Sequence, residues 1–135
     1  MRIAVPGAGE VGALLELPEN ARWMLVLAHG AGAGMSHPFL ASLAREFAAA
    51  GVGTLRYQFP YMEERGRVPD SPEILTATVA AAVRAAAEAA PGLPILAGGK
   101  SMGGRMTSQA AARGLLEQVR GLVFFGFPLH PPGRP

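Results

Sequence analysis

The chain alternates between short, continuous apolar runs and longer segments in which apolar residues recur at helical spacing. The run WMLVLA at Trp23–Ala28 has the length of a strand and no polar face, which is typical of a strand buried on both sides of a parallel sheet. Five further strands are predicted, the first two around the turn-rich GAGE: Arg2–Pro6, Val11–Leu17, Val52–Tyr57, Leu93–Ala97 and Leu122–Phe127.

Three predicted helices separate the later strands. The first begins at Pro38 and stops at Gly51, because proline favours a first helical turn and glycine favours the end of a helix. The second is alanine-rich, spans about 71–90, and is expected to pack closely on the sheet. The third runs from Met102 to about Gly114, and 58–69 is an irregular loop.

Strands that alternate with helices predict a mostly parallel sheet with helices on both faces, in the α/β class. No repeat or linker divides the chain, so residues 1–135 are expected to form one domain. Ligands of such sheets bind at the carboxyl ends of the strands. The loops to consider are therefore HGAGAG, QFPYMEERGR and GGKSMGG.

Composition excludes several classes of protein. The formal charge is only +2, and the twelve basic residues are scattered singly, which argues against nucleic acid as a partner. Cysteine is absent, so disulfides, thiolate metal sites and cysteine nucleophiles are excluded. The start does not resemble a signal peptide, and no apolar run approaches the ~20 residues that span a bilayer. We expect a cytoplasmic protein with no membrane partner, no metal and no cofactor.

The sequence GAGEVG at residues 7–12 matches the dinucleotide fingerprint GxGxxG but lacks its context. A helix should begin at these glycines, yet Pro18 cuts the following segment short. The next strand ends in His29-Gly30 rather than in an acidic residue that would bind the ribose. We interpret GAGEVG as a hairpin turn.

A phosphate-binding loop, GxxxxGK[ST], would have to end at Gly99-Lys100-Ser101. Pro94 then stands where the first glycine belongs, and the residues between them belong to a predicted strand. Asp70, the only aspartate, precedes a helix and is poorly placed to hold magnesium. Nucleotide binding is therefore the weakest of three functional alternatives; the other two are a serine hydrolase and a non-catalytic interaction domain.

The same stretch contains GxSxG, from Gly99 to Gly103, in the order strand, sharp turn, helix. This order is typical of a nucleophile elbow, in which the turn exposes a serine hydroxyl at the edge of the sheet. Ser101 is then the candidate nucleophile, and the Met102 N–H is placed to donate to an oxyanion. The alternative is a serine in a purely structural turn.

A second oxyanion donor is expected from a glycine-rich loop that follows an earlier strand. HGAGAG, after Trp23–Ala28, meets that requirement. Ala31 is the first choice of donor and Gly32 the alternative.

Four segments together resemble the small α/β-hydrolase-like family related to dienelactone hydrolases: LVLAHGAGAGMSHPFL, LRYQFPYMEERGRVPD, GGKSMGGR and GFPLHPPGRP. The family includes testis-expressed hydrolase-like proteins and a non-catalytic subunit of a chromatin complex. The resemblance covers almost the whole chain. It implies that Ser101 is the nucleophile and that Ala31 and Met102 surround the oxyanion.

The chain departs from the family after the serine. The fold orders its triad as serine, acid, histidine. Only Glu117 is acidic after Ser101, and the only later histidine is His130, which is either a base lent to a neighbouring molecule or part of an extended tail. By resemblance, the family's acid and base lie on later strands, so we expect a domain truncated after 122–127.

Other polar residues have simpler interpretations. His29 is expected to order the glycine loop, and His37 to cap a helix with Ser36. Lys100 and Arg105 either attract an anionic substrate or are solvated charges at a helix start.

The loop 58–69 carries Phe59, Tyr61 and Met62, which are expected to border the pocket. Aromatic residues accommodate many acyl groups, so the substrate stays undefined.

Two functions remain in front. The first is a serine hydrolase that acts on an ester or similar acyl compound but is nearly inactive as this chain alone, because acid and base are missing. The second is a non-catalytic interaction domain of the same fold. The predicted strand 122–127 would be a sheet edge, so we expect a homo-oligomer or a missing C-terminal segment to cover it.

Overall fold

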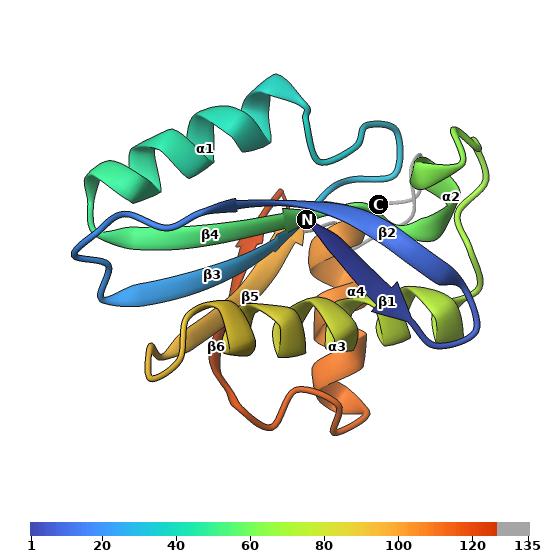
Figure 1. Ribbon diagram of the computed structural model, residues 1–135. Helices are drawn as coiled ribbons and strands as arrows, with labels where there is room; N and C mark the ends of the chain where they lie inside the picture. The colour runs from blue at the N-terminus through green and yellow to red at the C-terminus, as the bar shows by residue number, and fades with distance from the viewer. Residues whose placement is uncertain (127–135) are drawn as a thin grey trace.

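The computed structural model describes residues 1–126, which form a six-stranded sheet in the order β1-β2-β4-β3-β5-β6 (Figure 1). β3, β4, β5 and β6 are parallel, whereas β1 and β2 join by antiparallel pairing. The bounds of the strands are β1 Arg2–Val5, β2 Gly9–Glu16, β3 Trp23–Ala28, β4 Val52–Tyr57, β5 Ile95–Lys100 and β6 Val119–Phe125.

Helices cover both faces of the sheet. α1 (Pro38–Ala49) lies on one face, and α3 (Pro72–Ala89) and α4 (Met102–Ala112) lie on the other (Figure 1). A four-residue helix, α2 (Pro60–Glu63), follows β4. The mostly parallel α/β sheet predicted from the sequence is therefore confirmed.

The two faces carry cores of different size. The larger core packs β-strand residues such as Val26 and Leu55 against α3 and α4. α3 contributes mainly alanines, which allow the helix to approach the sheet closely. The smaller core joins Leu25 and Leu27 of β3 to Leu40 of α1. β3 is thus buried on both faces, as its continuous apolar run predicts.

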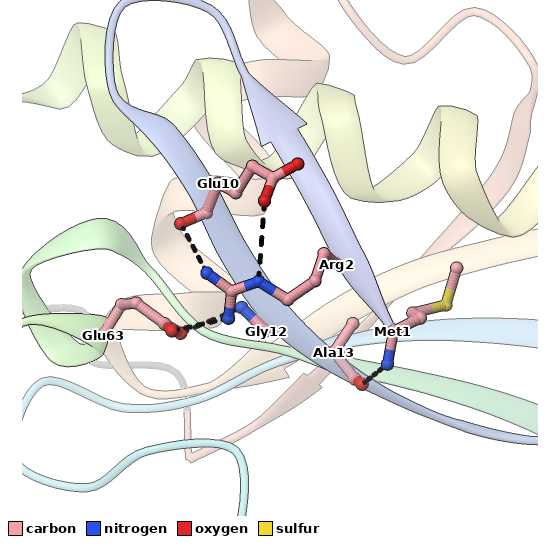
Figure 2. Close-up of polar contacts among 6 residues, drawn as sticks. All are labelled: Met1, Arg2, Glu10, Gly12, Ala13 and Glu63. Carbon is pink, nitrogen blue, oxygen red and sulfur yellow. Dashed lines mark hydrogen bonds and ion pairs between the residues drawn. The ribbon is translucent and has the colours of Figure 1, made fainter.

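The β1–β2 hairpin is joined to α2 by polar contacts that Figure 2 shows. The Arg2 guanidinium donates to Glu63 Oε2 at 2.7 Å and lies 3.8 Å from the Glu10 carboxylate. Glu63 Oε1 accepts from the Gly12 N–H at 2.9 Å, and the amino group of Met1 donates to the Ala13 carbonyl at 3.0 Å. The short helix is therefore attached to the antiparallel edge of the sheet.

Several predicted boundaries differ from the structure. The strand expected at 93–97 begins at Ile95 and extends to Lys100, because Gly98 and Gly99 complete the parallel pairing with β3 and β6. The strand expected at 122–127 begins at Val119 and ends at Phe125. The loop predicted at 58–69 contains α2, and GAGEVG forms the β1–β2 hairpin as expected.

Candidate functional site

The site lies where the connections that follow two neighbouring strands lead to opposite faces of the sheet. β3 and β5 are adjacent and parallel, but β3 continues into α1 on one face and β5 into α4 on the other. The loops after the two strands therefore separate and leave a crevice at the carboxyl edge of the sheet. HGAGAG lines one side of this crevice, and GGKSMGG lines the other.

Ser101 occupies the turn between β5 and α4. Its φ of 53° and ψ of −114° lie in a region that L residues rarely adopt. Its N–H donates to the Phe125 carbonyl at 3.0 Å, and its own carbonyl accepts from the Arg105 N–H, the first bond of α4. The turn is thus fixed to β6 on one side and to the helix on the other.

The glycines on either side of Ser101 are required by packing. A Cβ on Gly99 would lie 2.6 Å from the Ala28 carbonyl oxygen, and a Cβ on Gly103 would collide with the His29 carbonyl oxygen. α4 therefore crosses the end of β3 at a distance that only glycine permits. The sharp strand-to-helix turn predicted from GxSxG is present.

The candidate oxyanion donors lie beside the serine. Gly30 is close enough that an added Cβ would lie 3.9 Å from the Ser101 Cβ. Within residues 1–126, the N–H groups of Ala31, Gly32 and Met102 donate to no acceptor. The Met102 N–H begins α4, where the helix dipole favours negative charge.

A pocket of about 340 Å³ opens between the two loops. Ser101 and Lys100 line it from the elbow, and the glycine-rich loop and the start of α1 supply the remaining walls: His29, Gly30, Ala31, Gly32, Ala33, His37, Phe39 and Leu40. The structure therefore brings Ser101 together with both candidate donors of the earlier loop.

His29 lies fully buried under the glycine-rich loop. Its Nδ1 is 2.6 Å from the Gly30 carbonyl oxygen, and its Nε2 accepts from the Phe59 N–H at 3.0 Å. Burial lowers the pKa of His29, although the contact with the Gly30 carbonyl opposes this change. His29 is thus neutral with its proton on Nδ1, and it orders the loop as the sequence predicts.

Residues in and after β4 hold the same loop by hydrogen bonds. The Tyr61 hydroxyl donates to the Ala31 carbonyl at 2.8 Å. Gln58 Oε1 accepts from the Met35 N–H at 2.8 Å, and the buried Arg56 guanidinium donates to the Met35 carbonyl at 3.0 Å. No motif in the sequence indicates these contacts.

This arrangement corrects one expectation. Phe59 and Tyr61 are buried behind the loop rather than bordering the pocket, and Met62 does not line the pocket either. The loop 58–69 therefore supports the site instead of forming its wall.

The other charged and histidine residues have local roles. His37 is the N-cap of α1, and its Nδ1 accepts from the Phe39 N–H at 3.1 Å, which confirms the predicted cap. Lys100 ends β5 rather than starting a helix, and its Nζ lies 5.7 Å from the Phe39 ring centroid. Arg105 is exposed on α4.

Within residues 1–126, no candidate acid or base lies beside the Ser101 hydroxyl. Glu117 is exposed beyond the end of α4, just before β6. It therefore lies at the amino-terminal ends of the parallel strands, whereas Ser101 lies at their carboxyl ends. Asp70 accepts from the Tyr61 N–H at 2.9 Å. His130 lies outside the described residues. Within residues 1–126, no side chain hydrogen-bonds to the Ser101 hydroxyl, and no group of side chains has the composition of a metal site.

Sequence comparison finds one family. The alpha/beta hydrolase domain family matches residues 21–135. Among curated proteins, none matches the sequence significantly. Within the part of the chain that the structure describes, no helix is long and apolar enough to cross a membrane.

The fold is similar to that of several solved structures. A dienelactone hydrolase from Anabaena variabilis has a TM-score of 0.78 and 22% identity over 92% of this chain and 60% of its own. Est1E from Butyrivibrio proteoclasticus, solved with bound ferulic acid, has a TM-score of 0.74 and 22% identity over 90% of this chain and 50% of its own. A serine hydrolase without a lid from Xanthomonas campestris has a TM-score of 0.75 and 17% identity over 92% of this chain and 58% of its own. The chain thus spans about half to three fifths of these proteins.

Proposed function

Since the chain belongs to the alpha/beta hydrolase domain family, we propose that it carries the nucleophile, Ser101, of a serine hydrolase acting on an ester or similar acyl substrate. The observation that carries this proposal is the φ of 53° at Ser101, between two glycines that allow no side chain. Such a backbone at the edge of a pocket supports a role for the exposed hydroxyl in attack. A structural turn alone would not need a serine there.

The geometry supports the following reaction. The Ser101 hydroxyl attacks the acyl carbon, and the carbonyl electron pair moves to the oxygen, which becomes negatively charged. The N–H groups of Ala31 and Met102 donate hydrogen bonds to this oxyanion, with Gly32 as the alternative donor. Each such donor contributes about 3 kcal/mol in the transition state. The proton of Ser101 must pass to a base, which gives it to the leaving alkoxide when the oxyanion collapses and the ester C–O bond breaks. Water then attacks the acyl carbon, and the acid is released as Ser101 recovers its proton.

Neither histidine of residues 1–126 is suited to act as that base. A neutral imidazole has one lone pair, and in His29 it accepts from the Phe59 N–H. In His37 it accepts from the Phe39 N–H, which leaves a proton on Nε2. Neither ring offers a free basic nitrogen to Ser101. We therefore expect slow turnover from this chain alone, since an unactivated serine is a weak nucleophile.

The substrate class rests on the pocket and on the structural neighbours. A volume of about 340 Å³, with Phe39 and Leu40 among the walls, suits a small acyl group. The neighbours include a dienelactone hydrolase, a carboxyl esterase from Bacillus coagulans and Est1E with bound ferulic acid. Carboxylic esters are accordingly the proposed class.

Covalent labelling tests the nucleophile independently of turnover. At pH 9, hydroxide can partly take the place of a general base, and a fluorophosphonate should add one phosphonyl group to Ser101, detected by intact mass. Ser101→Ala should remove the adduct. Ser108→Ala, a control on the same helix, should keep it. Equal labelling of Ser101→Ala and the unmodified chain would contradict the proposal.

Ester hydrolysis tests whether a base reaches Ser101. At neutral pH, p-nitrophenyl acetate hydrolysis by the chain should stay close to that of Ser101→Ala. A fast rate that Ser101→Ala abolishes would show that a base reaches the serine after all.

The second candidate is a non-catalytic interaction domain, which the sheet edge favours. Among residues 1–126, β6 has β5 as its only partner strand, and its Leu122 is 37% exposed. Two-fold pairing of β6 in a homodimer would cover this edge. Light scattering at increasing concentration should then detect a dimer that Leu122→Lys weakens and Leu115→Lys, a control on the connection before β6, leaves intact. A monodisperse monomer would contradict it.

A further inference from the structure

The loop after β3 contains two consecutive peptide groups whose carbonyl oxygens are both held by buried side chains. His29 Nδ1 donates to the Gly30 carbonyl at 2.6 Å, and the Tyr61 hydroxyl donates to the Ala31 carbonyl at 2.8 Å. The loop is otherwise made of glycine and alanine from 30 to 34, which by themselves leave the direction of each peptide group undetermined.

Both carbonyls point toward the same side of the loop. The His29 and Tyr61 rings contact each other edge to face, with centroids 6.1 Å apart, and their residues are 0% and 5% exposed. They therefore form one buried surface beneath the loop, and each of its two donors takes one of the two carbonyls.

The N–H groups of these two peptides consequently share the opposite side. The peptide bonds of the described residues are trans, so each N–H points away from the carbonyl of its own peptide group. The Gly30–Ala31 peptide directs the Ala31 N–H away from His29, and the Ala31–Gly32 peptide directs the Gly32 N–H away from Tyr61. Two successive N–H groups that face one way form a concave site for an anion.

Tyr61 is itself held firmly. Its N–H donates to Asp70 Oδ2 at 2.9 Å, and Glu63 of the same short helix binds Gly12 and Arg2 of the hairpin (Figure 2). Burial, and secondarily the charge of Asp70, raise the pKa of Tyr61, so the phenol keeps its proton. The hydroxyl is therefore a permanent donor at a fixed place.

We propose that Tyr61 is a positioning residue, which turns the Gly32 N–H into the crevice so that Ala31 and Gly32 donate together to one negatively charged oxygen. Ala31 and Gly32 then act jointly, instead of as alternatives, and Met102 adds a third donor from the elbow. This inference rests on the proposed function, because it concerns the oxyanion of that reaction. The ligand class is a substrate or analogue with an anionic oxygen, such as a carboxylate or phosphonate.

An NMR titration of the ¹³C,¹⁵N-labelled chain with phenylphosphonate tests the proposal without requiring turnover. The amide protons of Ala31, Gly32 and Met102 should shift together on binding. Tyr61→Phe should weaken binding about tenfold and abolish the shift of Gly32 selectively, because one hydrogen bond no longer orients its peptide. Without ligand, the Ala31 carbonyl carbon should also move upfield in Tyr61→Phe.

Tyr57→Phe is the matched control. Tyr57 is fully buried on β4, and within residues 1–126 no hydrogen bond joins its hydroxyl to the β3–α1 loop. Its loss should leave the affinity and the shifts of Ala31 and Gly32 unchanged. Asp70 binds the backbone of Tyr61, so the Tyr61→Phe chain should retain its fold and the amide spectrum of the sheet.

Two results would overturn the proposal: a Tyr61→Phe chain that binds phenylphosphonate like the unmodified chain, or an unmodified chain in which Ala31 and Gly32 do not respond. Failure of the proposed function is seen separately, as fluorophosphonate labelling that does not depend on Ser101. Anion binding needs no nucleophile, so either proposal can fail while the other holds.

Discussion

The two loops that meet at the crevice are held in place by opposite means. The β5–α4 turn requires residues without a side chain, since a Cβ on Gly99 or Gly103 would overlap the backbone at the end of β3. The β3–α1 loop depends on side chains that are present, because its peptide groups are bound by His29, Tyr61 and residues of β4. The β5–α4 turn is therefore sensitive to added side-chain atoms, and the β3–α1 loop is sensitive to the removal of the side chains that bind it.

The largest effect is expected from Gly103→Ala. Besides the collision with the His29 carbonyl, the new Cβ would lie 2.8 Å from the Ala28 Cβ. Because backbone atoms cannot move aside, we expect a loss of about 3 kcal/mol in the free energy of unfolding, measured with urea. Gly32→Ala is the control in the other loop, where nothing lies within 4 Å of an added Cβ, and should change stability by less than about 0.5 kcal/mol. Equal losses would remove the contrast between the loops.

Arg56→Met should have the next largest effect. The Arg56 side chain is 8% exposed and contacts Glu16 Oε1 at 2.7 Å and the Met35 carbonyl at 3.0 Å. Because Glu16 is 35% exposed and can be hydrated, we expect a loss of about 2 kcal/mol rather than the full cost of a buried unpaired charge. The Met35 amide should also exchange faster with solvent.

The exposed Arg2 provides the comparison for Arg56. Arg2→Met removes a contact with Glu63 at the surface and should destabilise the chain far less. If the two arginines had equal effects, Arg56 would not be a specific support of the β3–α1 loop.

The free energy of unfolding should depend on pH through His29. Its pKa is lowered below the ordinary value of 6.5, so the unfolded chain binds more protons than the folded one. Stability is then full above pH 6.5 and falls as the pH decreases, by at most about 1.4 kcal/mol per pH unit until the folded pKa is reached. Urea unfolding between pH 7 and pH 5 measures this slope.

His29→Gln is the control for the pH dependence and should flatten the curve above pH 5. Glu63 does not interfere, because its hydrogen bond to Arg2 lowers its pKa. Its contribution to the free energy of unfolding is therefore lost only below about pH 4.5. A pH-independent stability of the unmodified chain between pH 7 and 5 would contradict the neutral, buried state of His29.

Apart from the control variants, the smallest effect is expected from His37→Ala at the end of the β3–α1 loop. This change removes the acceptor for the Phe39 N–H at the start of α1 and should cost about 1 kcal/mol in thermal unfolding. His37→Asn keeps a capping acceptor and should cost much less. A similar loss in both variants would mean that His37 acts through packing.

The contrast also explains what the sequence could predict. The elbow is local: Gly99, Ser101 and Gly103 lie within five residues, so the pattern is visible before any folding. The supports of the other loop come from residues about 20 to 30 positions later, such as Gln58 and Tyr61, and meet it only through the pairing of β3 with β4. Polar contacts between distant residues leave no periodic signal.

Strand prediction failed at one place for a related reason. Gly98 and Gly99 are poor strand formers, so the sequence places the end of the strand before them. Parallel partners on both sides make them part of β5, and a Cβ on Gly98 would overlap the Val123 carbonyl. α2 escaped prediction because four residues give too short a pattern.

The backbone of Ser101 has one more consequence. Its φ of 53° is a torsion that glycine adopts without steric conflict, so a serine here is less stable than a glycine would be, and the proposed role of its hydroxyl would account for its presence. A descendant copy under selection for folding alone would gain by exchanging Ser101 for glycine while keeping every other residue of the elbow. Under the proposed function, a glycine at position 101 in a related chain would therefore mark the loss of the nucleophile.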